Sequence, residues 1–353
     1  MDLDNTLWGG IVGDDGWQNL KIGGHDPQGE AFADFQRTLK SFHRRGIILA
    51  IVSKNQPEIV WQAFEQHPEM VLKRTDFATW RINWQDKVEN IMDLLKELNL
   101  TEEAAVFIDD NPAERDRVQK AMPAVLVPAW PLNSLLYTKT LLSLRCFDTA
   151  SITTDDRKRN EMYTQEKQRT QLRQSMQNAQ EWLASLETTV TTAPLTDADL
   201  PRAAQLLNKT NQMNLSTRRL SEGDLMNWGK AANHRIWIFR VHDKLGDSGL
   251  TGIASFEYSK SSACITDFIL SCRVFGRHIE NVMIKTMIDE CQRLGLQELK
   301  AVYLKTDKNQ PCLEFFNEAS HFAKSEENTF VWKIKDKYPD AWPIIIKNRG
   351  TIQ

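Results

Sequence analysis

The chain has 353 residues, of which 41% are hydrophobic and 26% are charged, and its formal net charge is −3. This balance excludes a disordered or fibrous chain, and the lack of a positive excess argues against broad, non-specific binding to nucleic acid. The longest uninterrupted apolar run, residues 47–52, is far shorter than the ~20 residues that a membrane span needs. A chain of this length usually forms about two domains.

The N-terminal residues and the cysteines indicate the cellular compartment. Residues 2–15 are rich in Asp and Gly and show neither the basic nor the apolar region of a secretion signal. The five cysteines have neither CxxC nor metal-ligand spacing; they are Cys146, Cys264, Cys272, Cys291 and Cys312. An odd number of unpatterned cysteines is typical of reduced thiols in a cytosol. We therefore expect a cytoplasmic protein without a membrane partner.

Residues 1–130 predict a first α/β domain. Short apolar runs bounded by polar residues or proline predict buried strands at 47–53, 104–108 and 124–127. The segments at 30–44, 57–67 and 87–98 carry apolar residues at helical spacing. Such alternation of strands and helices predicts a mostly parallel sheet that helices cover on both faces.

The first motif in this domain is Asp2-Leu-Asp4-Asn-Thr6, in which two carboxylates stand two residues apart. At the end of a strand, residues i and i+2 share one side, so both carboxylates can face the same cleft. One can bind Mg²⁺ and attack a phosphorus atom, while the other serves as acid and base. Because Asp-Asn-Thr clusters also occur in turns and helix caps, the motif alone leaves both interpretations open.

Further polar residues follow along the same scaffold. Ser53 and Lys54 stand at the end of the first strand, Lys87 opens the helix at 87–98, and Asp109 and Asp110 follow the strand at 104–108. The hydroxyl and ammonium groups can bind phosphate, and the paired carboxylates can complete an oxygen-rich Mg²⁺ site. Each residue alone also fits a helix cap, a solvated surface or a turn. Their order at the carboxyl ends of predicted parallel strands favours an aspartate-based phosphotransfer site.

Residues 131–186 differ in character and predict a helical linker. Their later part is rich in glutamine and charged residues, and its apolar residues at 172, 176, 179, 183 and 186 are spaced by three or four. This spacing is typical of one face of a helix. We interpret the segment as a solvated connecting helix.

Residues 187–335 predict a second α/β domain with more strands. Strands are expected at 235–241 and 249–258, joined by turn residues at 246–249, and the sheet continues at 262–274 and 299–304. A helix is expected at 277–294. Residues 336–353 form a tail to which the sequence assigns no structure.

A second group of candidate residues lies in this domain. A loop with Gly276, flanked by Arg273, Arg277 and His278, runs into a helix and directs free N–H groups toward one point, which favours a pyrophosphate. An ordinary strand-to-helix turn has the same spacing. Further on, Asn309 opens a helix with an aromatic edge, which core packing explains equally well.

Three other side chains in this domain are candidates for acyl transfer, and each has a structural alternative. They are Asp267 as a base, Cys272 as a nucleophile and Tyr303 as a proton donor. A partly exposed strand carboxylate, a buried strand cysteine and a structural tyrosine are the corresponding alternatives. The sequence leaves each pair of interpretations open.

At this point a family resemblance can be stated. DLDNTLWGG, IVSKN, the lysine in WQDKVENI, and FIDDNPAER closely resemble the motifs of the haloacid dehalogenase (HAD) superfamily, in particular of FkbH-like, or HAD-IIIC, phosphatases. The resemblance implies that Asp2 is the nucleophile and that Asp4 is the acid and base and binds Mg²⁺ through its backbone carbonyl. It implies phosphate-binding roles for Ser53 and Lys87, with Asp109 and Asp110 holding the metal.

One departure from this family concerns the start of the sheet. In the family an apolar strand precedes the first aspartate, whereas only Met1 precedes Asp2. We therefore expect the HAD-like Rossmannoid sheet to lack its first strand and the chain to be weakly active.

The second domain resembles GNAT acyltransferases. SCRVFGR and NKTNQMNLSTRR look like the C-terminal half of FkbH-like proteins, and the loop around Gly276 and the helix from Asn309 resemble GNAT motifs. The resemblance implies a GNAT-like α/β domain in which the pantetheine arm of CoA or of a carrier protein is bound. The residues implied are Arg273, Gly276, Arg277, His278 and Asn309.

FkbH-like proteins are associated with the glyceryl-derived extender unit of polyketide pathways. The resemblance implies an enzyme that uses a small phosphorylated acyl donor such as 1,3-bisphosphoglycerate. The glyceryl group is passed to an acyl carrier protein and phosphate is lost. Two alternatives remain open. One is a Mg²⁺-dependent phosphatase with a GNAT domain that acts on a sugar or surface-polymer intermediate, and the other is an inactive, truncated module that binds a carrier protein.

Overall fold

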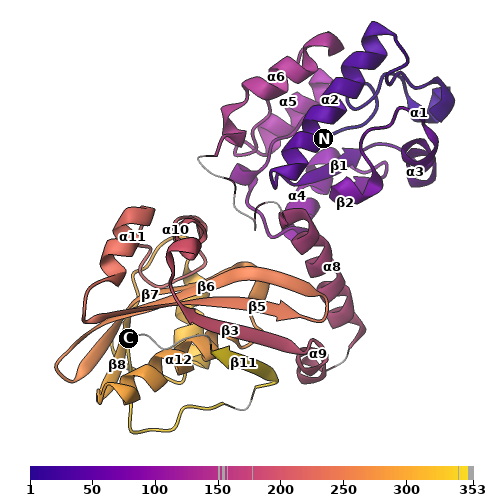
Figure 1. Ribbon diagram of the computed structural model, residues 1–353. Coiled ribbons are helices and arrows are strands. Elements are labelled where there is room, and N and C mark those ends of the chain that lie inside the picture. The colour runs from indigo at the N-terminus through magenta and orange to yellow at the C-terminus, as the bar shows by residue number, and fades with distance from the viewer. Residues whose placement is uncertain (150–151, 153–155, 157, 177, 341, 349–353) are drawn as a thin grey trace. The chain divides into compact units, whose positions relative to one another are not determined.

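A computed structural model describes residues 1–149, 152, 156, 158–176, 178–340 and 342–348. The chain divides into two compact units, Met1–Thr164 and Gln165–Gln353 (Figure 1). Residues 131–164, part of the expected linker, therefore belong to the first unit, and the remainder belongs to the second. Within the described ranges, no helix is long and apolar enough to cross a membrane.

The first unit is an α/β structure in which helices surround a short parallel sheet (Figure 1). Its helices are α1 (Val12–Asp15), α2 (Pro27–Arg44), α3 (Pro57–Gln66), α4 (Lys87–Glu97), α5 (Pro112–Ala121) and α6 (Tyr137–Ser143), and its strands are β1 (Leu49–Ser53) and β2 (Phe77–Ile82). The segments around 105–107 and 126 add a parallel bridge beside them. The predicted strand at 47–53 is confirmed, and β2 is a strand that the sequence analysis missed.

The N-terminus of the chain lies inside this sheet, next to β1. The Met1 ammonium donates a hydrogen bond to the Ala50 carbonyl at 2.9 Å, and the Val52 N–H donates one to the Met1 carbonyl at 2.9 Å. On the other side, the Asp2 N–H donates to the Ile108 carbonyl at 2.9 Å. Met1 and Asp2 therefore stand where a central strand would run, but they contribute only two residues to it.

An apolar cavity lies where such a strand would continue backwards from Met1. It has a volume of about 410 Å³, and β1, α4 and the segment at 104–108 contribute to its lining, with Leu49, Leu94 and Phe107 among the lining residues. Within the described ranges, no strand occupies this place beside β1.

Asx caps fix the starts of the two helices that follow the candidate site residues. Asp86 accepts a hydrogen bond from the Val88 N–H, so α4 begins at Lys87. Asn111 accepts one from the Ala113 N–H and is followed by a proline, so α5 begins directly after the two aspartates of the FIDDNPAER motif. Such caps satisfy N–H groups that have no partner within the helix.

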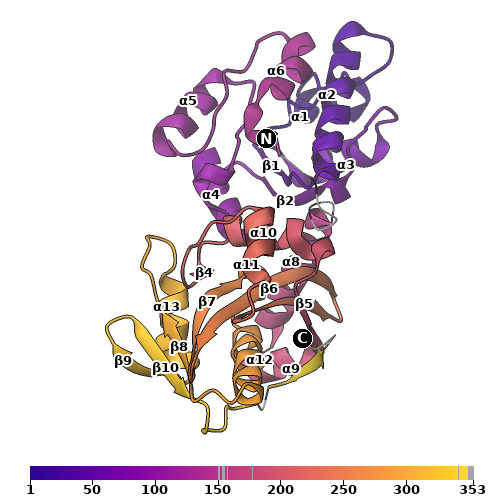
Figure 2. The ribbon, with the colours of Figure 1, turned by 60° about the vertical axis from the view of Figure 1, so that its left-hand side comes forward.

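The second unit is built on a nine-stranded mixed sheet (Figure 2). Its strands are β3 (Thr188–Pro194), β4 (Met213–Asn214), β5 (His234–Asp243), β6 (Gly246–Ser259), β7 (Ser262–Leu270), β8 (Glu298–Val302), β9 (Ala323–Glu326), β10 (Thr329–Lys333) and β11 (Ile344–Asn348). The order is β11-β3-β5-β6-β7-β8-β10-β9, and β4 pairs with β7 outside this path. The pairs β11–β3 and β7–β8 are parallel and the others are antiparallel.

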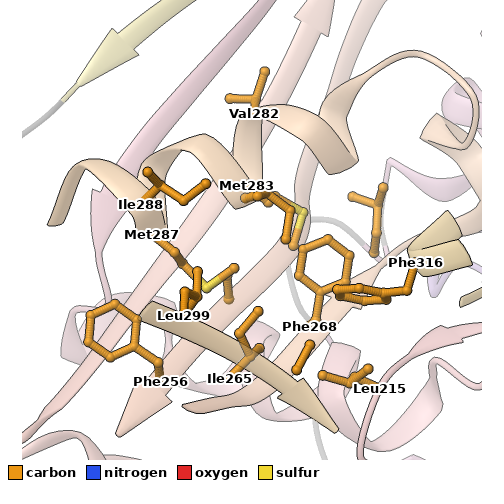
Figure 3. Close-up of a cluster of buried hydrophobic side chains, with 14 of the residues drawn as sticks. Leu215, Phe256, Ile265, Phe268, Val282, Met283, Met287, Ile288, Leu299 and Phe316 are labelled. Atoms are coloured by element: carbon orange, nitrogen blue, oxygen red, sulfur yellow. The ribbon is translucent and has the colours of Figure 1, made fainter. Parts of the chain in front are cut away.

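Helices cover both faces of this sheet. They are α9 (Ala179–Ser185), α10 (Leu200–Lys209), α11 (Glu222–Gly229), α12 (Ile279–Arg293) and α13 (Gln310–Glu314), which continues as a π-helical turn at Phe315–Ala319. The alternation of β5 shows the two faces, since Ile236 and Ile238 pack in one core cluster with α10 and α11, and Trp237 and Phe239 pack in the other with α12. Figure 3 shows side chains of α12, Met283 and Met287 among them, over the strand residues of this second cluster.

The expected connecting helix is two helices. α8 (Arg159–Ser175) ends before Met176, and α9 begins after the cap residue Asn178. Trp182, Leu183 and Leu186 form a small buried cluster against which Leu172 packs. The predicted apolar stripe is therefore only partly solvated: Leu183 and Leu186 are buried, whereas Leu172 and Met176 are half-buried and Ala179 is exposed.

Candidate active site

Three carboxylates meet at one edge of the first unit. Asp2, Asp109 and Asp110 each offer an oxygen, and these oxygens all lie within 4.8 Å of one another. They follow two neighbouring extended segments, which the bond from the Asp2 N–H to the Ile108 carbonyl joins. Thr6 donates to Asp110 Oδ1 at 3.2 Å and accepts from the Asp110 N–H at 3.0 Å, which fixes the second aspartate of the pair.

One buried ammonium group faces this cluster. Lys87 Nζ lies 2.6 Å from Asp109 Oδ2 and 3.0 Å from Asp2 Oδ1. Burial raises the pKa of Asp109 to about 6, and the charge of Asp2 adds to the shift. The pKa of Asp110 is also raised, by burial and then by Asp2. Burial opposes the charge on Lys87, but Asp2 and Asp109 outweigh it and raise its pKa.

The cluster fits a hard divalent cation. Three carboxylates beside one ammonium leave an excess of negative charge in a buried place, which a cation would relieve. Asp2 Oδ1 is buried and has no hydrogen-bond partner among the described residues, although Lys87 Nζ lies within ion-pair distance of it. Carboxylate oxygens are the ligands that Mg²⁺ prefers in proteins. The donor set of Asp2, Asp109 and Asp110 is therefore suited to Mg²⁺.

Asp4 stands outside this cluster and has its own set of donors. Its Oδ1 accepts from Trp8 Nε1 at 2.9 Å and from the Val12 N–H at 3.0 Å, and its Oδ2 accepts from Asn55 Nδ2 at 2.8 Å. Burial raises the pKa of this half-buried carboxyl above its ordinary value. A carboxyl that is fixed in place and has a raised pKa is suited to give and take protons.

Sequence reasoning missed Trp8 and Asn55 as members of the site. The position of Asn55, two residues after Ser53 at the end of β1, was a usable signal, because such residues share one side of a strand. Asn55 also donates to the buried Ser53 hydroxyl at 3.3 Å. Lys54 points elsewhere, since its Nζ lies 2.6 Å from Glu114 Oε1 on α5. Its ammonium therefore already has a carboxylate partner.

In the second unit, the residues around Gly276 bind groups of the chain itself. The Gly276 N–H donates to Glu280 Oε1 at 3.0 Å. Arg277 is buried, and its Nη2 lies 2.7 Å from Asp243 Oδ2. His278 adopts a left-handed conformation before α12 and stacks on Trp342. Arg273 Nε donates to Ser271 Oγ at 3.2 Å.

The remaining candidates of this unit are also held internally. Asp267 is fully buried, forms an ion pair with Arg218 and accepts from Ser255 Oγ at 2.6 Å, so it is not poised as a free base. The Tyr303 hydroxyl donates to Asn309 Oδ1 at 2.6 Å, and both side chains are buried. Cys272 lies half-buried in a short 3₁₀ turn. The structure therefore groups Tyr303 with Asn309 but places neither in an open site.

Comparisons with known proteins find similar solved structures for parts of the chain. The N-terminal part of a Bacteroides fragilis protein that contains a phosphatase domain, complexed with Mg, is 45% identical with a TM-score of 0.42. The match covers 42% of this chain and 40% of that one, so the chain spans less than half of that protein. No family model matches this chain, and no curated protein matches it.

Acetyltransferases are also among the similar structures. The ribosomal-protein-S18-alanine N-acetyltransferase of Escherichia coli is 11% identical with a TM-score of 0.31, covering 41% of this chain and 94% of that one. A mutant spermidine N-acetyltransferase of Vibrio cholerae is 17% identical with a TM-score of 0.32, covering 41% and 94%. The predicted fold class agrees with the two units in its coarse form, since the first is an α/β unit with the parallel strands β1 and β2 and the second is an α/β unit on a mixed sheet.

Proposed function

We propose that the first unit is a Mg²⁺-dependent phosphohydrolase of HAD type with Asp2 as its nucleophile. The observation that supports this most strongly is the meeting of Asp2, Asp109 and Asp110 beside the buried ammonium of Lys87. These three carboxylates would hold the ion. When bound, Mg²⁺ would withdraw charge from the transferring phosphoryl group.

In this proposal the side chains divide the reaction between them. An Asp2 carboxylate oxygen attacks phosphorus, and the bond from phosphorus to the leaving oxygen breaks while protonated Asp4 gives that oxygen its proton. Asp4 then takes a proton from a water molecule, which attacks the aspartyl phosphate, so that inorganic phosphate leaves and Asp2 is regenerated. Lys87 and the Ser53 hydroxyl stabilise the non-bridging phosphoryl oxygens.

Turnover of an aryl phosphate tests this proposal. We expect p-nitrophenyl phosphate to be hydrolysed with Mg²⁺ and not with EDTA, and Asp2→Asn to remove the activity while the circular dichroism spectrum and the melting temperature are retained. Activity that persists in EDTA, or in Asp2→Asn, would contradict the proposal. Complete inactivity of the wild-type chain on any phosphate would favour the carrier-binding module.

The motif resemblance suggests a finer proposal, in which the donor is an acyl phosphate such as 1,3-bisphosphoglycerate. The protein would act in the cytoplasm. There the thiol of a carrier-bound phosphopantetheine would attack the glyceryl carbonyl of the donor. A thioester C–S bond forms, the C–O bond to phosphate breaks, and inorganic phosphate leaves with the bonding electron pair and takes up the thiol proton. The phosphate ester that remains at C3 is then hydrolysed at the Asp2 site, which leaves the glyceryl thioester. The resemblance to FkbH-like motifs is the support for this acceptor and donor.

A mass shift of the carrier protein tests the finer proposal. Loading with a glyceryl group should require the donor, Mg²⁺ and the phosphopantetheine arm together. Phosphate release without any loading would favour the phosphatase that acts on a sugar or surface-polymer intermediate.

A further inference from the structure

The start of α12 is the place where an anionic ligand of the second unit was expected, and a carboxylate of the chain already lies there. Glu280, in the first turn of α12, is buried and accepts the Gly276 N–H at 3.0 Å. The N-terminus of a helix carries partial positive charge and free N–H groups, which favour one anion. Here that anion is Glu280, and a pyrophosphate at the same donors would meet its charge.

The arginine that follows Gly276 is directed away from any ligand of the loop. The Arg277 guanidinium is 2% exposed, and its Nη2 donates to Asp243 Oδ2 at 2.7 Å and to Thr188 Oγ1 at 3.1 Å. Arg169 of α8 donates to the same carboxylate at 2.7 Å. Breaking a buried ion pair of this kind is strongly unfavourable. Of the two arginines of the loop, Arg277 is therefore committed to the interior of the unit, whereas Arg273 is half-buried and donates to Ser271.

A third observation concerns the gap between the parallel strands β7 and β8. The two strands pair through four residue pairs, from Ser262↔Glu298 to Ile265↔Ala301. Farther along β7, the strand β4 pairs with it instead, and the Leu215 carbonyl accepts the Leu304 N–H at 3.0 Å. The segment at 213–215 thus bonds to the chain after β8 as well as to β7. It takes backbone groups that an extended amide-bearing ligand would need.

Asn309, which was predicted to bind pantetheine, and Tyr303, which was predicted to donate a proton, hold this segment in place. Asn309 is fully buried and donates to the Asn214 carbonyl at 3.0 Å, and it accepts from Tyr303. A buried network in which every member has a partner is rigid and costly to open. Asn309 and Tyr303 therefore serve to fix β4 rather than to receive a ligand.

From these three independent observations we infer that the second unit is closed to CoA by its own side chains and backbone. Glu280 holds the Gly276 N–H that a pyrophosphate at this helix start would use. The segment at 213–215 holds backbone groups of β7 and of the chain after β8 that an extended pantetheine arm would use. The residues present do not fit that cofactor. This unit therefore neither takes an acyl group from CoA nor gives one to CoA. The inference concerns the second unit and goes beyond the function proposed for the first.

Hydrogen exchange of the full-length chain tests this inference. The amides around Gly276 are followed in Mg²⁺-free buffer with inorganic pyrophosphate, pantetheine or CoA at millimolar concentration. In the wild type we expect no ligand to slow exchange at 274–281 or at 213–215. In Glu280→Ala, pyrophosphate should give a saturable slowing of about tenfold once it exceeds its Kd tenfold. Glu222→Ala, which removes an exposed glutamate from the first turn of α11, is the matched control.

The outcomes separate clearly. Saturable protection at 274–281 by CoA in the wild type would overturn the inference, even if Glu280→Ala fails to fold. Saturable protection at 213–215 by CoA or pantetheine in the wild type would overturn it as well. Ligand protection that is confined to the first unit would support it, since the second unit then stays closed. A folded Glu280→Ala that gains no pyrophosphate binding would overturn the part assigned to Glu280. If Glu222→Ala also gains pyrophosphate binding, the part assigned to Glu280 is overturned, because the gain then follows from the loss of one negative charge anywhere in the unit.

Discussion

The side-chain amide of Asn55 donates a hydrogen bond of 2.8 Å to Asp4 Oδ2, and so ties the carboxyl of the first motif to the end of β1. Trp8 Nε1 and the Val12 N–H hold the other oxygen. The plane of the Asp4 carboxyl is thus fixed from two sides, while the Asp2 carboxylate faces Lys87. In the proposed mechanism, this arrangement separates the proton-transfer group, Asp4, from the nucleophile, Asp2, within three residues of sequence.

Asn55→Ala tests Asn55 as a positioning residue. Loss of its amide should let the Asp4 carboxyl rotate, and a misplacement of 1 Å can cost about 100-fold in rate. We expect kcat for an aryl phosphate to fall by roughly 10- to 100-fold with KM little changed, and the pH profile to shift. Asn208→Ala, an exposed asparagine of the second unit, is the control. A change of KM of the same size, with kcat unchanged, would argue against a role through Asp4.

Asp109→Asn should weaken the binding of Mg²⁺. The substitution replaces a buried anionic oxygen with a neutral amide in a cluster of three carboxylates. We expect the Mg²⁺ concentration for half-maximal phosphate release to rise by at least roughly tenfold. Asp116→Asn on the exposed face of α5 should leave it unchanged. A titration that is identical for Asp109→Asn and the wild type would show that the metal assignment is wrong.

An apolar extension ahead of Met1 should stabilise the first unit. The Met1 amine is buried, and burial lowers its pKa to about 6, so a charge is unfavourable there. A peptide bond at this place keeps an N–H for the Ala50 carbonyl and removes the charge, and six apolar residues can fill the cavity of about 410 Å³. We expect a higher melting temperature and faster phosphate release. A Gly/Ser extension of equal length is the control, and equal melting temperatures for both extensions would contradict the prediction.

The pH dependence of stability should report the charge of Glu280. Burial raises the pKa of its carboxyl, while the Gly276 N–H and the Arg277 charge act against this shift. The native state therefore binds this proton more tightly than the unfolded state, so stability falls as pH rises from about 4.5 toward the folded-state pKa. The Glu280→Gln variant has no carboxyl at this position, so its stability does not fall with pH for this reason. We expect its melting temperature to exceed that of the wild type at neutral pH and the difference to shrink in acid. A difference that stays constant with pH would contradict this.

Local spacing predicted which carboxylates and which lysine of the first unit lie close together, because they stand at the ends of strands and the starts of helices. The strand β2 escaped the sequence analysis, since Thr79 and Arg81 interrupt its apolar residues. An ion pair with Glu97 on α4 stabilises the Arg81 guanidinium in this strand. Such a pairing depends on the tertiary fold and leaves no periodic signal.

The second unit shows the same limit more strongly. The loop around Gly276 has the spacing of an anion site, yet a glutamate four residues later takes its N–H. Arg277 pairs with Asp243 from β5, a partner that no local pattern indicates. A sequence motif predicts the path of the backbone. Which side chain accepts the hydrogen bonds of its free N–H groups depends on the tertiary fold.

The most direct test of the central claim is detection of phosphate on Asp2. The chain is incubated with Mg²⁺ and a phosphate donor, quenched in acid and digested, and the N-terminal peptide is analysed by mass spectrometry. We predict a phosphoryl group on Asp2 in the wild type, none in Asp2→Asn, and loss of phosphate release in the same variant. A phosphoryl group on another residue, or full phosphate release by Asp2→Asn, would contradict the account.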